Sequence, residues 1–138
     1  MDESLATEIA EAYMRWGVDG DLAIKELCSP SFHDNVSGLT GLHIFDVVAG
    51  WLDASFSGRR VEHHATMTDD DRVLVWYTQY GTHVGNGFPR MAGLPVTGAK
   101  VCWAQVHVLR VNDGKVVEHW AVRDDFAMIE QIRGHQDD

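Results

Sequence analysis

Hydrophobic and polar residues alternate at helical spacing in the first half of the chain. Apolar positions three or four residues apart predict helices over residues 4–16 and 42–56, and Asp21 can cap a short helix between them. Residues 29–41 are rich in Ser, Gly, Asn and Asp, which predicts a loop. The residues expected to end these helices are Gly17 or Gly20, Pro30 and Gly58.

The second half changes to the two-residue alternation that is typical of strands. The predicted strands cover residues 60–68, 72–83, 100–111 and 115–124. Residues 69–71 are three aspartates and predict a turn, whereas residues 84–98 hold four glycines and two prolines and predict a loop or flap. A last helix is expected from Asp124 or Asp125 to Gly134. Its predicted core-facing residues are Phe126, Ile129 and Ile132.

This order of elements predicts one α+β domain over residues 1–138. Helices come first, a run of antiparallel strands follows, and a short helix ends the chain. Helices packed on one face of a long, bent sheet would leave a pocket at its open end. The predicted fold is therefore a curved antiparallel sheet closed by N-terminal helices.

Composition excludes several classes of partner. The formal net charge is -10 and no basic stripe is present, so we expect neither nucleic acid nor an anionic membrane as a partner. No apolar stretch approaches the ~20 residues that span a bilayer, and the N-terminus lacks the pattern of a signal peptide. Cys28 and Cys102 form no Cys-x-x-Cys pair, which favours reduced cysteines in a cytoplasmic protein.

The turn at residues 112–114 decides how the last two strands pair. A two-residue turn would place Val111 opposite Val116, and a three-residue turn with a left-handed Gly114 would place it opposite Lys115. We prefer the second, because it sets His107 opposite His119 and gathers the polar residues on one face. In that register Gln105 and Trp103 lie opposite Ala121 and Arg123, and Leu109 and Val117 complete the face.

The two faces of this hairpin differ sharply. Two histidines, a glutamine and an arginine on the first face need either protein partners or a ligand, which leaves a core network and a pocket lining as alternatives; we favour the pocket. The second face is almost wholly apolar and needs a cover. We expect a homodimer that contacts through Val106, Val108, Trp120 and Val122.

Several motifs resemble those of one family, the SnoaL-like polyketide or ester cyclases of the nuclear-transport-factor-2-like superfamily. The stretch from Thr97 to Gly134 holds a strand that ends HVLRV, the DGK turn, EHW and a short helix that ends in Gln-x-x-Gly. Upstream, DRVLVWYTQYGTHVG and LCSPSFHDN resemble the strand and the Phe-x-x-His loop of the family. The resemblance covers most of the chain.

The resemblance implies a cone-shaped α+β fold with a deep hydrophobic pocket and no metal or organic cofactor. In the cyclases of this family, a His and an Asp on the last two strands serve an intramolecular aldol ring closure. The His position matches His107, whereas the Asp position falls at Ala121. Asn35 stands where the first loop of the family often has His.

With Ala121 at the acidic position of the family, the resemblance implies acid–base chemistry on an apolar carbonyl compound such as a polyketide, by cyclisation, isomerisation or hydration. His107 and His119 are the candidate proton-handling groups, and Arg123 could polarise a carbonyl or hold a carboxylate. The candidate substrate-binding residues are Asn35, Tyr77, Trp103, Gln105, Ala121 and Asp124.

Two alternatives stay open beside a cofactor-free enzyme. A non-catalytic binding module would have an occluded or fully apolar pocket, with both histidines hydrogen-bonded to protein. An epoxide-hydrolase-like enzyme would need two inward carboxylates around Arg123. Asp124 could be one of them, although we favour it as the N-cap of the last helix. The histidine spacing matches no metal motif, so we expect no metal site.

Overall fold

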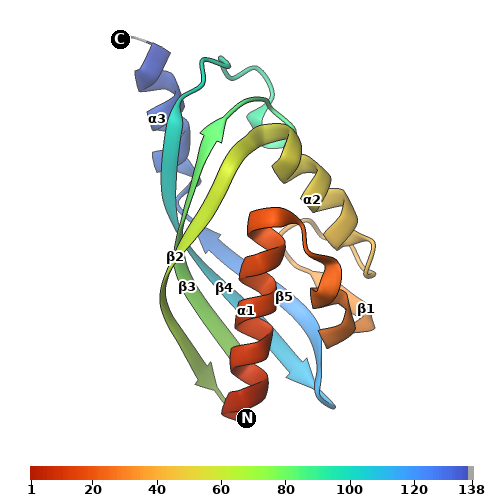
Figure 1. Cartoon of the computed structure of the whole chain (residues 1–138). Helices are drawn as coiled ribbons and strands as arrows, with labels where there is room; N and C mark the ends of the chain where they lie inside the picture. Colours follow the sequence, from red (N-terminus) through yellow and green to blue (C-terminus); the bar gives the residue numbers. More distant parts are fainter. Residues whose placement is uncertain (137–138) are drawn as a thin grey trace.

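The computed structural model describes residues 1–136 as a curved sheet with the first two α-helices along one side (Figure 1). The elements in chain order are α1 (Glu3–Asp19), η1 (Leu22–Leu27), β1 (Cys28–Asp34), α2 (Ile44–Ser55), β2 (Phe56–Asp69), β3 (Arg72–His83), η2 (Pro89–Met91), β4 (Lys100–Asn112), β5 (Lys115–Arg123) and α3 (Asp125–Gln136). The predicted α+β class is confirmed. None of the described helices is both long and apolar enough to cross a membrane.

The sheet has the order β1-β5-β4-β3-β2 and is mixed rather than wholly antiparallel. Strand β1 pairs with β5 in parallel, whereas the other neighbours are antiparallel. The prediction of a loop over residues 29–41 was therefore wrong for its first part. Cys28, Phe32 and Asp34 are buried there, and Pro30 is tolerated because β1 lies at the edge of the sheet.

The β4–β5 hairpin uses the two-residue turn, so the preferred register was wrong. Asp113 and Gly114 both have positive φ, 51° and 74°, and Val111 lies opposite Val116. A β-bulge at Val117 then adds one residue to β5. Because of it, Val116 and not Val117 is buried on the inner face of the hairpin.

Beyond the bulge, the pairing differs from the preferred one by two residues. His107 lies opposite Ala121, and His119 lies opposite Leu109. Side chains alternate with a period of two, so an even shift keeps every residue on its face. The polar residues therefore still share one side of the hairpin.

The helix boundaries differ from those that local propensity predicts, because packing also determines where a helix ends. Helix α1 continues through Gly17 and ends at Gly20, whose φ of 75° is the left-handed conformation of a C-cap. Helix α2 ends before Phe56, which instead begins β2. The prediction that Phe126 faces the core was wrong: it is 74% exposed, and Met128 is buried with Ile132 one turn later.

Helix α3 covers the part of β4 that does not pair with β5 and forms hydrogen bonds with its backbone. The Gln131 amide accepts from the Cys102 backbone N–H and donates to its carbonyl, both at 2.8 Å, in the manner of a neighbouring strand. The Asp124 N–H donates to the Ala104 carbonyl at 2.9 Å. These bonds satisfy backbone groups that a free edge would leave exposed.

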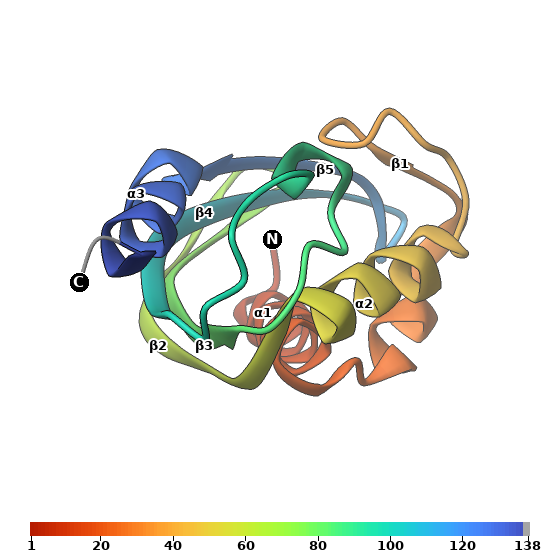
Figure 2. The same cartoon turned by 90° about the horizontal axis from the view of Figure 1, so that it is seen from above.

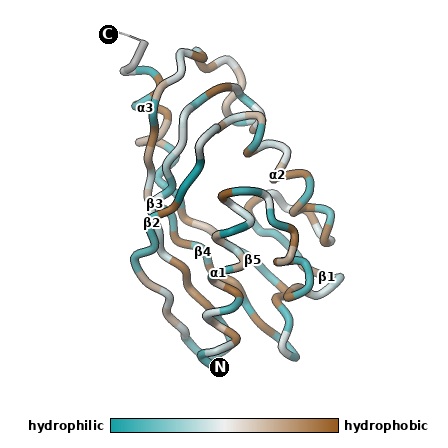
Figure 3. The backbone as a smooth tube through the Cα atoms, viewed as in Figure 1, coloured by the Kyte–Doolittle hydropathy of each residue, from teal (hydrophilic) through white to brown (hydrophobic). Residues whose placement is uncertain are grey.

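Helices α1 and α2 lie on the concave side of the sheet, and the 84–98 segment crosses the open end of the cone (Figure 2). Hydrophobic and hydrophilic residues alternate along the strands (Figure 3). The core consists of the inward residues of β3 and β4 together with the apolar faces of α1 and α2.

Candidate active site

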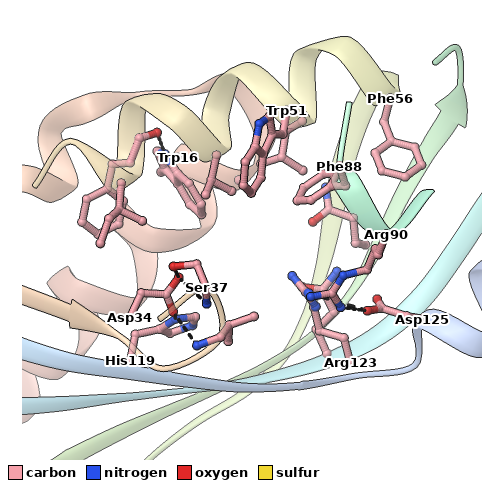
Figure 4. Close-up of a pocket in the computed structure, with 18 of the residues that line it drawn as sticks. Trp16, Asp34, Ser37, Trp51, Phe56, Phe88, Arg90, His119, Arg123 and Asp125 are labelled. Carbon is pink, nitrogen blue, oxygen red and sulfur yellow. Dashed lines mark hydrogen bonds and ion pairs between the residues drawn. The ribbon is translucent and has the colours of Figure 1, made fainter. Parts of the chain in front are cut away.

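A cavity of about 400 Å³ lies between the concave sheet face, the two long helices and the 84–98 segment. Its walls are mostly apolar, and several large aromatic rings line it (Figure 4). These include Trp16, Trp51, Phe56, Phe88 and Trp103. A cavity of this size and character suits a flat, apolar small molecule.

A chain of hydrogen bonds joins side chains of the cavity wall through His107, which does not itself line the cavity. Asp34 Oδ1 lies 2.8 Å from His119 Nδ1, and His119 Nε2 lies 2.8 Å from His107 Nδ1. The Tyr13 hydroxyl lies 3.0 Å from His107 Nδ1 and 3.1 Å from His119 Nε2. Asp34 and His119 line the cavity, whereas His107 lies in the layer behind His119.

The far end of this chain is also bonded. His107 Nε2 lies 2.9 Å from the Tyr77 hydroxyl and 2.7 Å from Gln105 Oε1. We call Tyr13, Asp34, Tyr77, Gln105, His107 and His119 the buried polar network; all six are buried. Burial raises the pKa of the Tyr13 and Tyr77 hydroxyls, so both stay neutral at physiological pH.

The parallel β1–β5 pairing positions the carboxylate of the network. Asp34 is the last residue of β1 and lies opposite His119 in the register. Its other contacts come from the turn that follows, where the Ser37 hydroxyl donates to Oδ2 at 2.8 Å and the Val36 N–H to Oδ1 at 3.1 Å. Burial raises the pKa of the carboxyl, but the bonds and charge of His119, with the bonds from Ser37 and Val36, outweigh it and lower the pKa to about 2.

The proton positions follow from the donor and acceptor inventory of these groups. Ionised Asp34 can only accept, so His119 Nδ1 carries a proton. Burial lowers the pKa of the His107 ring well below its usual value, and His119 and Arg123 add to this, so His107 is neutral. Neutral His107 donates from Nε2 to Gln105 Oε1, and its Nδ1 therefore accepts.

Two protonation states of His119 satisfy these contacts. When His119 Nε2 carries a proton, it donates to His107 Nδ1. When that proton is absent, the Tyr13 hydroxyl can donate to His107 Nδ1 instead, which leaves His119 Nε2 open as a base. The network can therefore hold His119 as an acid or as a base.

A second group of charges lies where β5 meets α3, on the other side of the cavity. Arg90 Nη1 contacts Asp125 Oδ2 at 2.8 Å, and Arg123 Nη2 lies 3.6 Å from the same oxygen. Arg90 comes from the 84–98 segment, so Asp125 ties that segment to the sheet. Figure 4 shows both guanidinium groups beside Phe88, across the cavity from Asp34 and His119.

The sheet wall near Arg123 carries buried donors without protein partners. Gln79 and Trp103 lie opposite each other on β3 and β4 and both line the cavity. Among the described residues, no acceptor reaches Gln79 Nε2 or Trp103 Nε1. Such groups are rare in folded proteins because each costs about 1–3 kcal/mol.

The structure brings together part of the predicted site. The predicted residues that line the cavity are Tyr77, Trp103, Gln105, His119 and Arg123. Ala121 faces inward opposite His107. Asn35 is exposed and donates to the Glu118 carboxylate and the His119 carbonyl, outside the cavity.

Asp124 has the capping role that we favoured. Its carboxylate accepts from the Ala127 N–H at 3.1 Å, at the start of α3. The carboxylate near Arg123 is Asp125, which Arg90 shares, so the paired carboxylates of an epoxide hydrolase are not found around Arg123 in residues 1–136. Nor do His, Cys, Asp and Glu form a metal-binding cluster of three or more within the part of the chain that the structure describes.

Sequence reasoning missed Asp34, Tyr13 and Gln79. Asp34 follows Phe32 by two residues, so strand alternation would have placed it on the inner face had the segment been taken as a strand. Gln79 likewise shares the parity of Tyr77. Tyr13 lies on the buried face of α1, where nothing in the sequence separates a core tyrosine from a bonded one.

Comparisons with known proteins agree with this architecture. Residues 6–132 match the family model described as SnoaL-like polyketide cyclase. Aklanonic acid methyl ester cyclase DauD of Streptomyces sp. (strain C5) is 28% identical over 118 residues, which cover 83% of this chain and 71% of that protein. Nogalonic acid methyl ester cyclase of Streptomyces nogalater is 35% identical over 81 residues, 58% of each chain.

Solved structures share the fold. TsrD from Streptomyces laurentii superposes with a TM-score of 0.83 at 16% identity, covering 96% of this chain and 97% of TsrD. AclR from Streptomyces galilaeus, a proposed hydroxylase, superposes with a TM-score of 0.72 at 29% identity, covering 96% of this chain and 95% of AclR.

Proposed function

The chain belongs to the SnoaL-like polyketide cyclase family, and from that premise we propose that it closes a ring in an apolar polyketide-type carbonyl compound. The observation that carries the proposal is the His119–Asp34 pair, bonded at 2.8 Å on the wall of an aromatic-lined cavity. Relatives named as methyl ester cyclases support the reaction class. Aldol ring closure neither oxidises nor reduces its substrate, so acid–base groups suffice.

In the proposed reaction, His119 Nε2 exchanges its contacts with His107 and Tyr13 for the substrate and removes a proton from the carbon next to a substrate carbonyl. Ionised Asp34, bonded to Nδ1, stabilises the imidazolium that forms. The resulting enolate attacks a second carbonyl of the same molecule and forms a carbon–carbon bond. The new alkoxide then takes the proton back from His119, so the reaction leaves the enzyme unchanged.

This scheme assigns the carboxylate role to β1. The family position for an acidic residue on β5 holds Ala121, which cannot transfer a proton. Asp34 reaches His119 from the neighbouring strand instead, and the Ser37 hydroxyl and Val36 N–H fix its orientation. His107 acts on His119 as a positioning residue, because it lies behind that ring and bonds to it.

The test is turnover of aklanonic or nogalonic acid methyl ester, the substrates in the names of the relatives, by wild type and variants. We expect His119→Asn and Asp34→Asn to lower kcat/KM by about 10²- to 10⁴-fold, the usual range for loss of an acid–base group. His64→Asn is the matched control, because His64 lies on β2 and bonds to Thr78 away from the cavity.

Two results would contradict the proposal. One is an unchanged rate in His119→Asn. The other is tight binding of these esters without conversion by the wild type, which would indicate a binding module; the bonding of both histidines to protein groups is the feature expected of that alternative. Quenching of tryptophan fluorescence can measure the binding separately, because Trp16, Trp51 and Trp103 line the cavity.

We also propose a homodimer through the outer face of the β4–β5 hairpin. Val122 is 77% exposed, and Trp120 and Trp76 are exposed on the same sheet, an apolar surface that is costly to leave in water. Light scattering after size exclusion should give twice the chain mass, and Val122→Glu should give the monomer. A monomeric wild type at micromolar concentration would rule the dimer out.

A further inference from the structure

The arginine side of the cavity has more donors than acceptors. Within residues 1–136, no acceptor forms a hydrogen bond with the Arg123 guanidinium, although this side chain lines the cavity. Its nearest carboxylate oxygen, Asp125 Oδ2, is 3.6 Å away and accepts from Arg90 at 2.8 Å. Two guanidinium groups therefore share one carboxylate.

Two neutral donors on the same wall have the same deficit. Gln79 is 3% exposed and Trp103 is 6% exposed, and each has a buried N–H group without an acceptor among the described residues. The register places Trp103 diagonal to Arg123 and Gln79 one strand further away: Trp103 lies opposite Gln79 and two residues before Gln105, which lies opposite Arg123. This part of the sheet wall thus presents two unbonded N–H groups, on β4 and β3.

The charge balance of this region is opposite to that of the whole chain. The protein carries a formal net charge of -10, yet among the charged groups that line the cavity on this side, the guanidinium groups of Arg90 and Arg123 outnumber the single carboxylate of Asp125. A guanidinium fork matches the two oxygens of a carboxylate and forms two parallel charge-assisted bonds with it. Neutral carbonyl groups of a ligand could accept hydrogen bonds from the N–H groups, but they would leave the excess positive charge uncompensated.

We propose that this side of the cavity binds a carboxylate of the substrate, held by Arg123 with Gln79 and Trp103 beside it. The proposal rests on the proposed function in that it takes the cavity as the substrate site. It places a free acid group away from the carbon that His119 deprotonates. The substrate would then carry a free acid group, whereas the relatives are named for methyl esters.

Binding of two flat probes with the same ring system tests this proposal. Anthraquinone-2-carboxylic acid is compared with anthraquinone-2-carboxamide at pH 7.5, with Kd from quenching of tryptophan fluorescence. We expect the acid to bind wild type at least about tenfold more tightly, since bonds to charged groups exceed neutral ones by roughly this factor. The preference should shrink as salt is added.

The variants assign the preference to its residues. Arg123→Gln should remove it, Arg90→Gln should reduce it, and Arg110→Gln should leave it, because Arg110 pairs with Glu118 away from the cavity. Arg123→Lys keeps the charge and should retain part of the preference. Circular dichroism and the melting temperature establish that each variant is folded.

Equal affinities in wild type, or a preference that survives in Arg123→Gln, would overturn the carboxylate site. Asp34→Asn separates this outcome from failure of the proposed function. That variant should lose turnover while it keeps the preference for the acid, because Asp34 lies across the cavity from Arg123. Loss of turnover alone therefore leaves the carboxylate site supported.

Discussion

The two sides of the cavity are built in opposite ways. In the buried polar network, each side chain has at least one hydrogen-bond partner within the protein. On the arginine side, Gln79 and Trp103 present N–H groups that no described residue accepts, and Arg123 lies 3.6 Å from the Asp125 carboxylate that Arg90 also contacts. Gln79 and Trp103 are as deeply buried as the residues of the network and line the same cavity, so for these two residues the difference does not come from burial.

We interpret this difference as one between groups that transfer protons and groups that bind a ligand. A bonded network fixes the orientation of His119 before substrate arrives, which proton transfer requires. Unbonded donors lower the stability of the empty protein and gain their partners on binding. The bonded side should therefore contribute to the free energy of unfolding, whereas the arginine side should contribute to affinity.

Removal of the carboxylate from the bonded side should have the largest effect on stability. Asp34→Ala leaves His119 Nδ1 without its acceptor and removes the bonds to Val36 and Ser37. We expect the free energy of unfolding to fall by about 3 kcal/mol, measured by urea denaturation. Asp69→Ala, which removes an exposed pair with Arg72, should cost less than about 0.5 kcal/mol. Equal losses in the two variants would contradict the comparison.

Acidification should weaken the bonded side through His107. Its pKa is lowered in the folded protein, so below the unfolded value of about 6.5 the unfolded chain binds a proton that the folded chain does not. Stability from this group is present above pH ~6.5 and falls with decreasing pH, by up to about 1.4 kcal/mol per pH unit. Urea denaturation between pH 7 and pH 5 should show a slope that His107→Gln reduces. A slope that is the same in both proteins would exclude this group as its source.

Gln105 belongs to the buried polar network and Gln79 to the arginine side. Substitution of these two glutamines, which lie on the same sheet face, therefore compares the two sides directly. Gln105 Oε1 accepts from His107 Nε2 at 2.7 Å, so Gln105→Met leaves a buried donor with one acceptor fewer. We expect a loss of about 1–2 kcal/mol in the free energy of unfolding. Differential scanning calorimetry should show a lower melting temperature than for wild type. No change would mean that the bond to His107 contributes nothing.

The smallest effect is expected at the second glutamine. Gln79→Met has nearly the same volume and removes an amide whose N–H group has no partner. Stability of the empty protein should stay constant or rise by up to about 1 kcal/mol in the same calorimetry. A loss as large as that of Gln105→Met would show that Gln79 is bonded in solution.

Much of the fold could be predicted because each strand of the second half repeats its pattern many times. The range 72–83 coincides with β3, and the hairpin strands differ from β4 and β5 by one residue. Beyond the bulge, the assignment of residues to the two faces of the hairpin was correct although the predicted turn was wrong. A register shift of an even number of residues changes the pairing partner of each residue but not its face. His119 and Arg123 could therefore be placed inward without the correct register.

The missing strand explains what could not be predicted. β1 has the composition of a loop, with Ser29, Pro30, Ser31 and Asp34, and it becomes a strand by pairing with β5. Local propensity carries no signal for a parallel partner that follows so much later in the chain. Without β1, the carboxylate of the site could not be placed beside His119.

That pairing has a consequence for biosynthesis. Asp34 and His119 are 85 residues apart, and β5 is the last strand to leave the ribosome. An emerging chain can pair β2 with β3 early, but β1 cannot pair with β5 until residues 115–123 have been synthesised. Catalytic competence should therefore arise in one late step, and nascent chains that stall before residue 119 should hold no partly working enzyme.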